Sequence, residues 1–159
     1  MINLSAFGYE EKLKSPGKAF AKTFSNNSFI NGPAVKEFET AFAEFTGAKD
    51  CVAVSSCTSA LQLSLLALSI GPGDEVLVTD FSWISSSAVA SLVGATPVFC
   101  DIDLDTYHIS LDSVKRMYSD KVKAIIYPHL FGSMSDTTEL QSFCREKNIL
   151  FIEDSAQSL

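Results

Sequence analysis

Hydroxyl side chains cluster in the segment Ser55-Ser56-Cys57-Thr58-Ser59, which joins an apolar run to a stretch of helical composition. The free backbone N–H groups at the start of a helix bind anions, and neighbouring hydroxyls add further donors. The segment therefore predicts either a phosphate-binding turn or an ordinary helix cap. It lacks the glycines and the lysine of a Walker loop, and no GxGxxG motif occurs in the chain, which argues against a dinucleotide-binding fold.

Two carboxylates, Glu153 and Asp154, end the apolar run that starts at Leu150. A charge at the end of a buried strand is costly unless a cation or several hydrogen-bond donors meet it. Asp154 could therefore hold a protonated ring nitrogen of a ligand, or it could cap the next helix. The residue pattern favours neither over the other.

Two ring side chains follow other apolar runs. Trp83, the only tryptophan, lies in a loop after one run, where it could stack on a flat ligand or pack in a core or interface. His129 follows another run and could act as a catalytic base, although a hydrogen-bonded structural histidine is the commoner arrangement.

These residues must be positioned by alternating strands and helices. Short apolar runs predict strands at Cys51–Ser55, Glu75–Thr79, Pro97–Cys100, Ala124–Tyr127 and Leu150–Glu153. Helical spacing or composition predicts helices at Thr58–Ser69, Ser85–Leu92, Leu111–Tyr118 and Asp136–Asn148. Strands separated by crossover helices indicate an α/β fold with a doubly wound, mostly parallel sheet. Ligands of such sheets bind beyond the carboxyl ends of the strands, where the candidate residues lie.

The first part of the chain has a different pattern. Residues 1–32 contain no strand-like run and are expected to form an N-terminal arm and lead-in, with residues 33–159 forming the first part of a large domain. Pro33 opens a helix that presents an apolar face, and Gly47 ends it.

Composition narrows the classes of function. The 159 residues carry a net charge of −7 with a pI near 4.7, which argues against nucleic acid and anionic membranes as partners. Two histidines and four cysteines without CxxC spacing predict no metal site and buried, reduced thiols. With no apolar run long enough for a bilayer and no signal-peptide pattern at the start, a cytoplasmic protein is expected.

Several ordered motifs together resemble the DegT/DnrJ/EryC1/StrS sugar aminotransferases, and the resemblance covers nearly the whole chain. The motifs are Ser56-Cys57-Thr58-Ser59-Ala60-Leu61, Gly71-Pro72-Gly73-Asp74-Glu75-Val76, Gly94-Ala95-Thr96-Pro97-Val98-Phe99, Pro128-His129-Leu130-Phe131-Gly132 and Glu153-Asp154-Ser155-Ala156-Gln157. The resemblance implies a fold-type I enzyme that uses pyridoxal 5′-phosphate to move an amino group, usually from L-glutamate, onto a nucleotide-linked keto-sugar. It also implies a homodimer and a role in sugar or polysaccharide biosynthesis.

The resemblance also implies residue roles. Trp83 would stack on the pyridine ring, Asp154 would pair with the ring nitrogen, and Gln157 would bond the phenolic oxygen. The cofactor phosphate would be held by three successive residues, Cys57, Thr58 and Ser59. A stretch that touches substrate in relatives corresponds to Ser28, Phe29, Ile30 and Asn31.

The chain departs from the family pattern in two ways. Cys57 stands where many members have glycine, which suits a role for its backbone N–H with the thiol turned away. In addition, the Schiff-base lysine of the family follows the Asp-x-x-Gln motif by a few dozen residues, and no lysine of this chain matches it. The isolated 159-residue chain, an N-terminal portion, is therefore expected to be inactive. A pyridoxal-phosphate sugar dehydratase relative and a non-catalytic, truncated binding or assembly module remain as alternatives.

Overall fold

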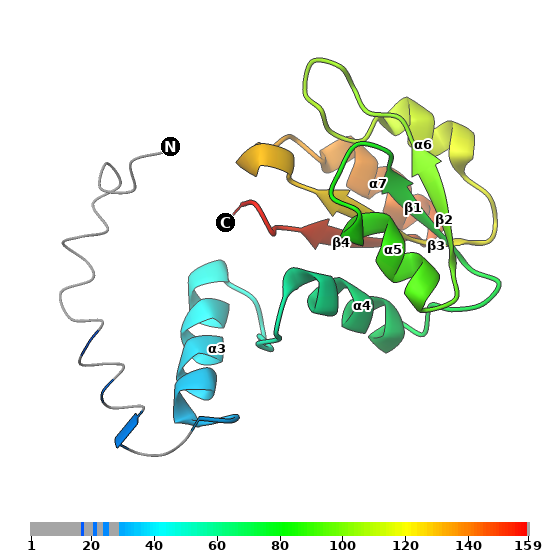
Figure 1. Cartoon of the computed structure of the whole chain (residues 1–159). Helices are drawn as coiled ribbons and strands as arrows, with labels where there is room; N and C mark the ends of the chain where they lie inside the picture. Colours follow the sequence, from blue (N-terminus) through cyan, green and yellow to red (C-terminus); the bar gives the residue numbers. More distant parts are fainter. Residues whose placement is uncertain (1–16, 18–20, 22–23, 26–28, 159) are drawn as a thin grey trace. The chain divides into compact units, whose positions relative to one another are not determined.

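The computed structural model describes residues 17, 21, 24–25 and 29–158, and its contacts divide into two compact units with the division between Ala53 and Val54 (Figure 1). The first unit contains helix α3 (Pro33–Thr46). Proline at its first position and Gly47 in the left-handed conformation, with φ 71°, bound this helix as the sequence predicts.

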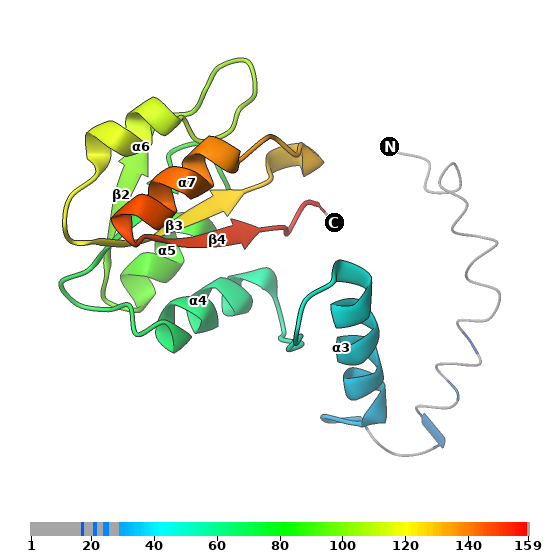
Figure 2. The same cartoon turned by 180° about the vertical axis from the view of Figure 1, so that it is seen from behind.

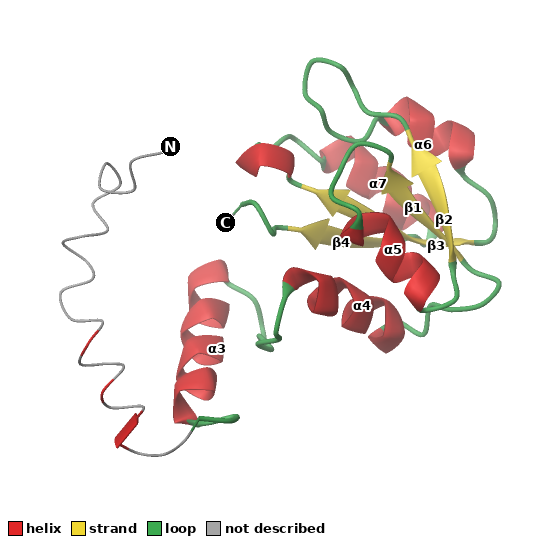
Figure 3. Cartoon of the chain, viewed as in Figure 1, coloured by secondary structure: helices red, strands yellow, loops and turns green. Residues whose placement is uncertain are grey.

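The second unit is built on a sheet of four parallel strands in the order β2-β1-β3-β4 (Figure 3). The strands are β1 (Glu75–Thr79), β2 (Thr96–Cys100), β3 (Val122–Pro128) and β4 (Leu150–Asp154). The helices are α4 (Cys57–Ala67), α5 (Ser85–Leu92), α6 (Leu111–Met117) and α7 (Thr138–Lys147), with a 3-10 turn, η2, at Leu130–Gly132. The predicted α/β class and parallel sheet are confirmed.

Helices cover both faces of this sheet because its strands are apolar on both sides. Val76, Val78, Ala124 and Ile126 pack with residues of α4 and α5 on one face. The alternate positions Leu77, Ile125 and Tyr127 pack with residues of α6 and α7 on the other. Figure 1 shows α5 in front of the sheet, and Figure 2 shows α6 and α7 from behind. The result is the three-layer arrangement typical of a doubly wound sheet.

The predicted first strand, Cys51–Ser55, is wrong. The structure gives this segment no strand, and the backbone N–H of Ala53 donates to Glu39 Oε1 at 2.9 Å. A run of alternating apolar residues becomes a strand only when its backbone groups find a neighbouring ladder. Here at least one of these groups bonds a side chain instead.

The other element boundaries shift by only a few residues. The predicted strand Glu75–Thr79 has the bounds observed for β1, whereas α7 begins two residues later than predicted. Asp136 Oδ1 accepts a hydrogen bond from the Thr138 N–H, so the polar residues ahead of α7 form a turn before the helix. Among the described residues, no helix combines the length and apolarity that crossing a bilayer requires.

Candidate functional site

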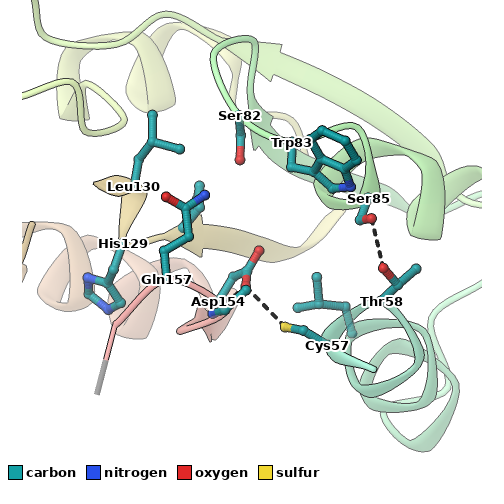
Figure 4. A pocket seen from close by; sticks show the side chains of 12 residues that line it. Cys57, Thr58, Ser82, Trp83, Ser85, His129, Leu130, Asp154 and Gln157 are labelled. Atoms are coloured by element: carbon teal, nitrogen blue, oxygen red, sulfur yellow. Dashed lines mark hydrogen bonds between the residues drawn. The ribbon is translucent and has the colours of Figure 1, made fainter. Parts of the chain in front are cut away.

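A pocket opens where the carboxyl ends of β3 and β4 meet the N-terminal ends of α4 and α5 (Figure 4). This is the position at which open parallel sheets bind ligands. All its lining residues belong to the second unit: Cys57, Thr58, Leu61, Ser82, Trp83, Ser85, Pro128, His129, Leu130, Asp154, Ala156 and Gln157.

Asp154, the last residue of β4, places its carboxylate in this pocket. Asp154 is only 9% exposed. Its Oδ1 accepts hydrogen bonds from the Ala156 N–H at 3.1 Å and from the Cys57 S–H, with Sγ at 3.2 Å. No lysine, arginine or histidine of the described residues forms an ion pair with it. A carboxylate this buried, with no cation of its own, is suited to a cationic group of a ligand.

The first turn of α4 forms the opposite wall of the pocket. Ser56 caps the helix by accepting the Ser59 N–H at 3.1 Å. The N–H groups of Cys57 and Thr58, the first two helical residues, donate no hydrogen bond to any residue that the structure describes. These free donors, at the positive end of the helix dipole, suit an anion such as phosphate.

The start of α5 lies beside the start of α4. Thr58 Oγ1 and Ser85 Oγ are 2.8 Å apart, so hydroxyls from both helices converge at one side of the pocket. Trp83, in the loop before α5, is 72% exposed and lines the same pocket, as Figure 4 shows. An exposed indole beside these free N–H donors offers a flat surface on which an aromatic ring can stack.

Gln157 lines another side of the pocket, and its side chain accepts a hydrogen bond from the backbone of Phe131. Its Oε1 accepts the Phe131 N–H at 2.6 Å, in a turn where Phe131 has φ 59° and Gly132 has φ 76°. A Cβ at Gly132 would lie 3.0 Å from the Gln157 carbonyl oxygen. Glycine is therefore needed at this position both for its φ and for the close approach.

His129 contacts the site mainly through its backbone. Its N–H donates to the Asp154 carbonyl oxygen at 3.1 Å, and its ring, 3.2 Å from Glu153 Oε1 through Nε2, points away from Trp83 in Figure 4. The side chain is buried, and Nδ1 has no partner among the described residues. This geometry supports the structural role that sequence statistics favour.

The second histidine, His108, packs against the rings of Tyr127 and His129. Its ring stacks on Tyr127 with centroids 5.5 Å apart, and Nε2 is 3.2 Å from Ser133 Oγ. Burial, reinforced by the nearby His129, lowers the pKa of His108 below its usual value of 6.5. The neutral ring is therefore the form that the fold stabilises.

The thiols differ from the expectation of four buried cysteines. Cys100 and Cys144 are buried, whereas Cys51 and Cys57 are half-buried. The thiol of Cys57 was expected to turn away from the site, but it lies in the pocket against Asp154, because Cys57 is already the first helical residue of α4. Burial, followed by the hydrogen bond and the charge of Asp154, raises the pKa of Cys57 to about 11.

The structure brings together most of the candidate residues of the sequence. Those that line the pocket are Cys57, Thr58, Trp83, His129, Asp154 and Gln157. Ser59 does not line it, because its N–H completes the helix cap and its Oγ lies 3.0 Å from Ser56 Oγ. Phe29, Ile30 and Asn31 belong to the first unit, and Ser28 lies outside the described residues.

The sequence did not indicate six of the pocket residues: Leu61, Ser82, Ser85, Pro128, Leu130 and Ala156. Ser85 and Thr58 are 27 residues apart in sequence, so no local spacing predicts their contact. The position of the loop at residues 80–84, directly after the apolar run of β1, was the signal that could have indicated Ser82 and Ser85. Within the part of the chain that the structure describes, no three His, Cys, Asp or Glu side chains gather as metal ligands would.

Comparison with known proteins agrees with this geometry. Residues 12–159 match the DegT/DnrJ/EryC1/StrS aminotransferase family. The chain is 38% identical over 140 residues to the dTDP-4-dehydro-2,3,6-trideoxy-D-glucose 4-aminotransferase of Saccharopolyspora spinosa, covering 87% of this chain and 36% of the relative. It is 36% identical over 137 residues to the UDP-2-acetamido-2-deoxy-3-oxo-D-glucuronate aminotransferase of Pseudomonas aeruginosa, and this match covers 86% of this chain and 38% of the relative.

A solved structure extends the likeness to the fold. The PLP form of Spr1654 from Streptococcus pneumoniae, a putative sugar aminotransferase by its description, superimposes with a TM-score of 0.82 at 32% identity, covering 87% of this chain and 39% of that chain. The chain thus spans somewhat more than a third of the length of these relatives. Since the family match covers more than nine-tenths of the sequence, the chain belongs to the DegT/DnrJ/EryC1/StrS aminotransferase family.

Proposed function

We propose that this protein is a pyridoxal-phosphate-dependent aminotransferase that transfers an amino group from L-glutamate to a nucleotide-linked keto-sugar. The names of the curated relatives support the substrate class, and the PLP form of the Streptococcus pneumoniae structure supports the cofactor. The pocket at the carboxyl edge of the sheet is the proposed cofactor site.

The buried carboxylate of Asp154 is the observation that carries this proposal. It is 9% exposed and hydrogen-bonded at one oxygen, and no cationic side chain of the described residues forms an ion pair with it. A protonated pyridine nitrogen would provide the missing positive charge and one N–H donor. Asp154 would then keep that nitrogen protonated.

The remaining pocket residues fit the other parts of the cofactor. The free N–H groups of Cys57 and Thr58 would hold the phosphate, with the Thr58 and Ser85 hydroxyls as further donors. Trp83 would stack on the ring, and the amide NH₂ of Gln157 would donate to the phenolic oxygen while Oε1 keeps its bond to the Phe131 N–H. Ser59 would act on the phosphate only indirectly, through the helix cap.

The bound cofactor would supply an aldehyde that accepts and returns the amino group and a ring that draws electrons from the substrate. The chain would orient that ring between Trp83 and the sheet edge and hold a proton at its nitrogen through Asp154. His129 would fix the backbone of Asp154, since its backbone N–H donates to the Asp154 carbonyl oxygen.

We further propose that residues 1–159 alone do not transfer amino groups. No lysine is among the pocket-lining residues, and the reaction needs an amine that binds the cofactor and moves a proton. Residues Ser28, Phe29, Ile30 and Asn31 would contact the sugar substrate in the complete enzyme. That enzyme would be a homodimer, which accords with the exposed leucines Leu63 and Leu66 on α4, 51% and 52% exposed.

Cofactor binding tests the site directly. Trp83 is the only tryptophan among residues 1–159, so in this 159-residue chain quenching of its fluorescence by pyridoxal phosphate reports occupancy of the pocket. Asp154→Asn removes the charge, and loss of a charge-assisted bond worth about 2 kcal/mol should weaken binding about 30-fold. Asp80→Asn is the matched control, because Asp80 follows β1, another strand of the same sheet, is exposed and does not line the pocket.

Activity tests the reaction. The complete enzyme should release 2-oxoglutarate from L-glutamate beyond one equivalent per enzyme only when a nucleotide-linked keto-sugar is present to accept the amino group, whereas the 159-residue chain should release none. Dehydration of the sugar without amine transfer would instead support the dehydratase alternative. Binding by Asp154→Asn as tight as by the Asp80→Asn control would contradict the assigned role of Asp154.

A further inference from the structure

The Cys57 thiol belongs to the immediate surroundings of Asp154, although the two residues are 97 positions apart in sequence. Sγ lies 3.2 Å from Asp154 Oδ1, and the Ala156 N–H reaches the same oxygen at 3.1 Å. Oδ2 receives no hydrogen bond from the residues that the structure describes. The two oxygens of the carboxylate are therefore in different environments (Figure 4).

The backbone of Asp154 is fixed independently of this thiol. Asp154 pairs with Pro128 in the parallel ladder of β3 and β4, and its carbonyl oxygen accepts the His129 N–H. What remains free is rotation of the side chain about its two torsions. The Ala156 N–H is a donor from the same turn, so Cys57 is the donor that ties the carboxylate to a different element, α4.

We propose that Cys57 is a positioning residue for Asp154: its S–H holds Oδ1 so that Oδ2 faces the place of the cofactor ring nitrogen. This inference rests on the proposed function, because the ring nitrogen belongs to the proposed cofactor. The same α4 residue then serves both ends of that cofactor, its backbone N–H toward the phosphate and its thiol toward Asp154. Glycine at this position would keep the first contact and lose the second.

Proton placement agrees with this assignment. A thiol that donates to a carboxylate keeps its proton, since a thiolate beside a second negative charge is unfavourable. The raised pKa of Cys57 has burial as its largest cause and Asp154 as the next. The two buried thiols, Cys100 and Cys144, owe their raised pKa mainly to burial and do not line the pocket.

Thiol reactivity tests the contact without any cofactor. In a Cys51→Ser background Cys57 is the half-buried thiol that remains, because Cys100 and Cys144 are each 1% exposed. Asp154→Asn should accelerate alkylation of Cys57 by iodoacetamide at mildly alkaline pH, about tenfold for each unit by which the thiol pKa falls. Asp80→Asn in the same background should leave the rate unchanged. An equal rate in both variants, with native circular dichroism, would overturn the pairing.

Cofactor affinity tests the positioning role. Equilibrium dialysis of the complete enzyme should show a Kd for pyridoxal phosphate about three- to tenfold weaker in Cys57→Ala, the range expected for one ordinary hydrogen bond, because a thiol is a weak donor. Cys57→Ser retains a donor and should bind within about twofold of the native protein. Cys51→Ala is the control for loss of a thiol outside the pocket and should bind as the native protein does.

The outcomes separate the two proposals. Equal affinity of Cys57→Ala and the native protein would overturn the role of Cys57 and leave the proposed function standing. Loss of affinity in Cys57→Ser equal to that in Cys57→Ala would also overturn it, because the effect would then come from packing. If the native complete enzyme binds no pyridoxal phosphate, the proposed function fails, and the positioning role fails with it.

Discussion

Replacing Gly132 by alanine should destabilise the fold through two effects that the structure separates. Gly132 has φ 76°, and alanine in the left-handed region costs about 1–2 kcal/mol. The new Cβ would also lie 3.0 Å from the Gln157 carbonyl oxygen, and forcing such a contact apart costs about 1–3 kcal/mol. The expected loss in the free energy of unfolding is therefore about 2–5 kcal/mol.

Gly73→Ala is the matched control for this prediction. Gly73 has φ 94° in the same unit, and a Cβ there meets no atom within 4 Å, so only the backbone cost of about 1–2 kcal/mol applies. Urea unfolding followed by far-ultraviolet circular dichroism measures both variants. Because Gln157 lines the pocket, Gly132→Ala should also weaken cofactor binding, whereas Gly73→Ala should not. Equal destabilisation by the two variants would refute the close-contact argument.

Three further predictions concern the core, the pH dependence and the ring-binding surface. Leu65→Ala, at a residue with no exposed surface, should cost about 2–5 kcal/mol in urea unfolding, while Leu104→Ala, at 82% exposure, should change it by less than about 0.5 kcal/mol. The lowered pKa of His108 means that the unfolded chain takes up a proton first, so stability should decrease as the pH falls below 6.5, and unfolding midpoints of His108→Gln should vary less over that range. In equilibrium dialysis, Trp83→Phe should retain most of the affinity for pyridoxal phosphate, whereas Trp83→Ala should bind it several-fold more weakly. Equal affinities of Trp83→Phe and Trp83→Ala would argue against ring stacking.

The sequence contains enough local information to predict most of the second unit. Glu75–Thr79 has its observed bounds because a Gly-Pro-Gly-Asp turn precedes an unbroken apolar run. Asp154 could be placed at the pocket because polar residues after apolar strands share one edge of a parallel sheet. These inferences need only neighbouring residues and a general rule of topology.

The errors arise where partners are distant in sequence. The run Cys51–Ser55 has strand-like composition, yet the Ala53 N–H bonds Glu39, 14 residues earlier. The direction of the Cys57 thiol depends on whether the helix begins at residue 57 or 58 and on a carboxylate 97 residues later. Composition and spacing contain neither piece of information.

The long separation between Cys57 and Asp154 has a consequence for the order of folding. The two walls of the pocket come from the start of α4 and the end of β4, so the pocket closes only after three strands have paired and β4 has added at the edge beside β3. Contacts that close long loops form late, because the entropy of the intervening chain must be lost first. During synthesis, the first turn of α4 would leave the ribosome well before the Asp154 carboxylate that faces it. A ligand that needs both walls would consequently recognise the sheet only after β4 has paired with β3, and not its folding precursors.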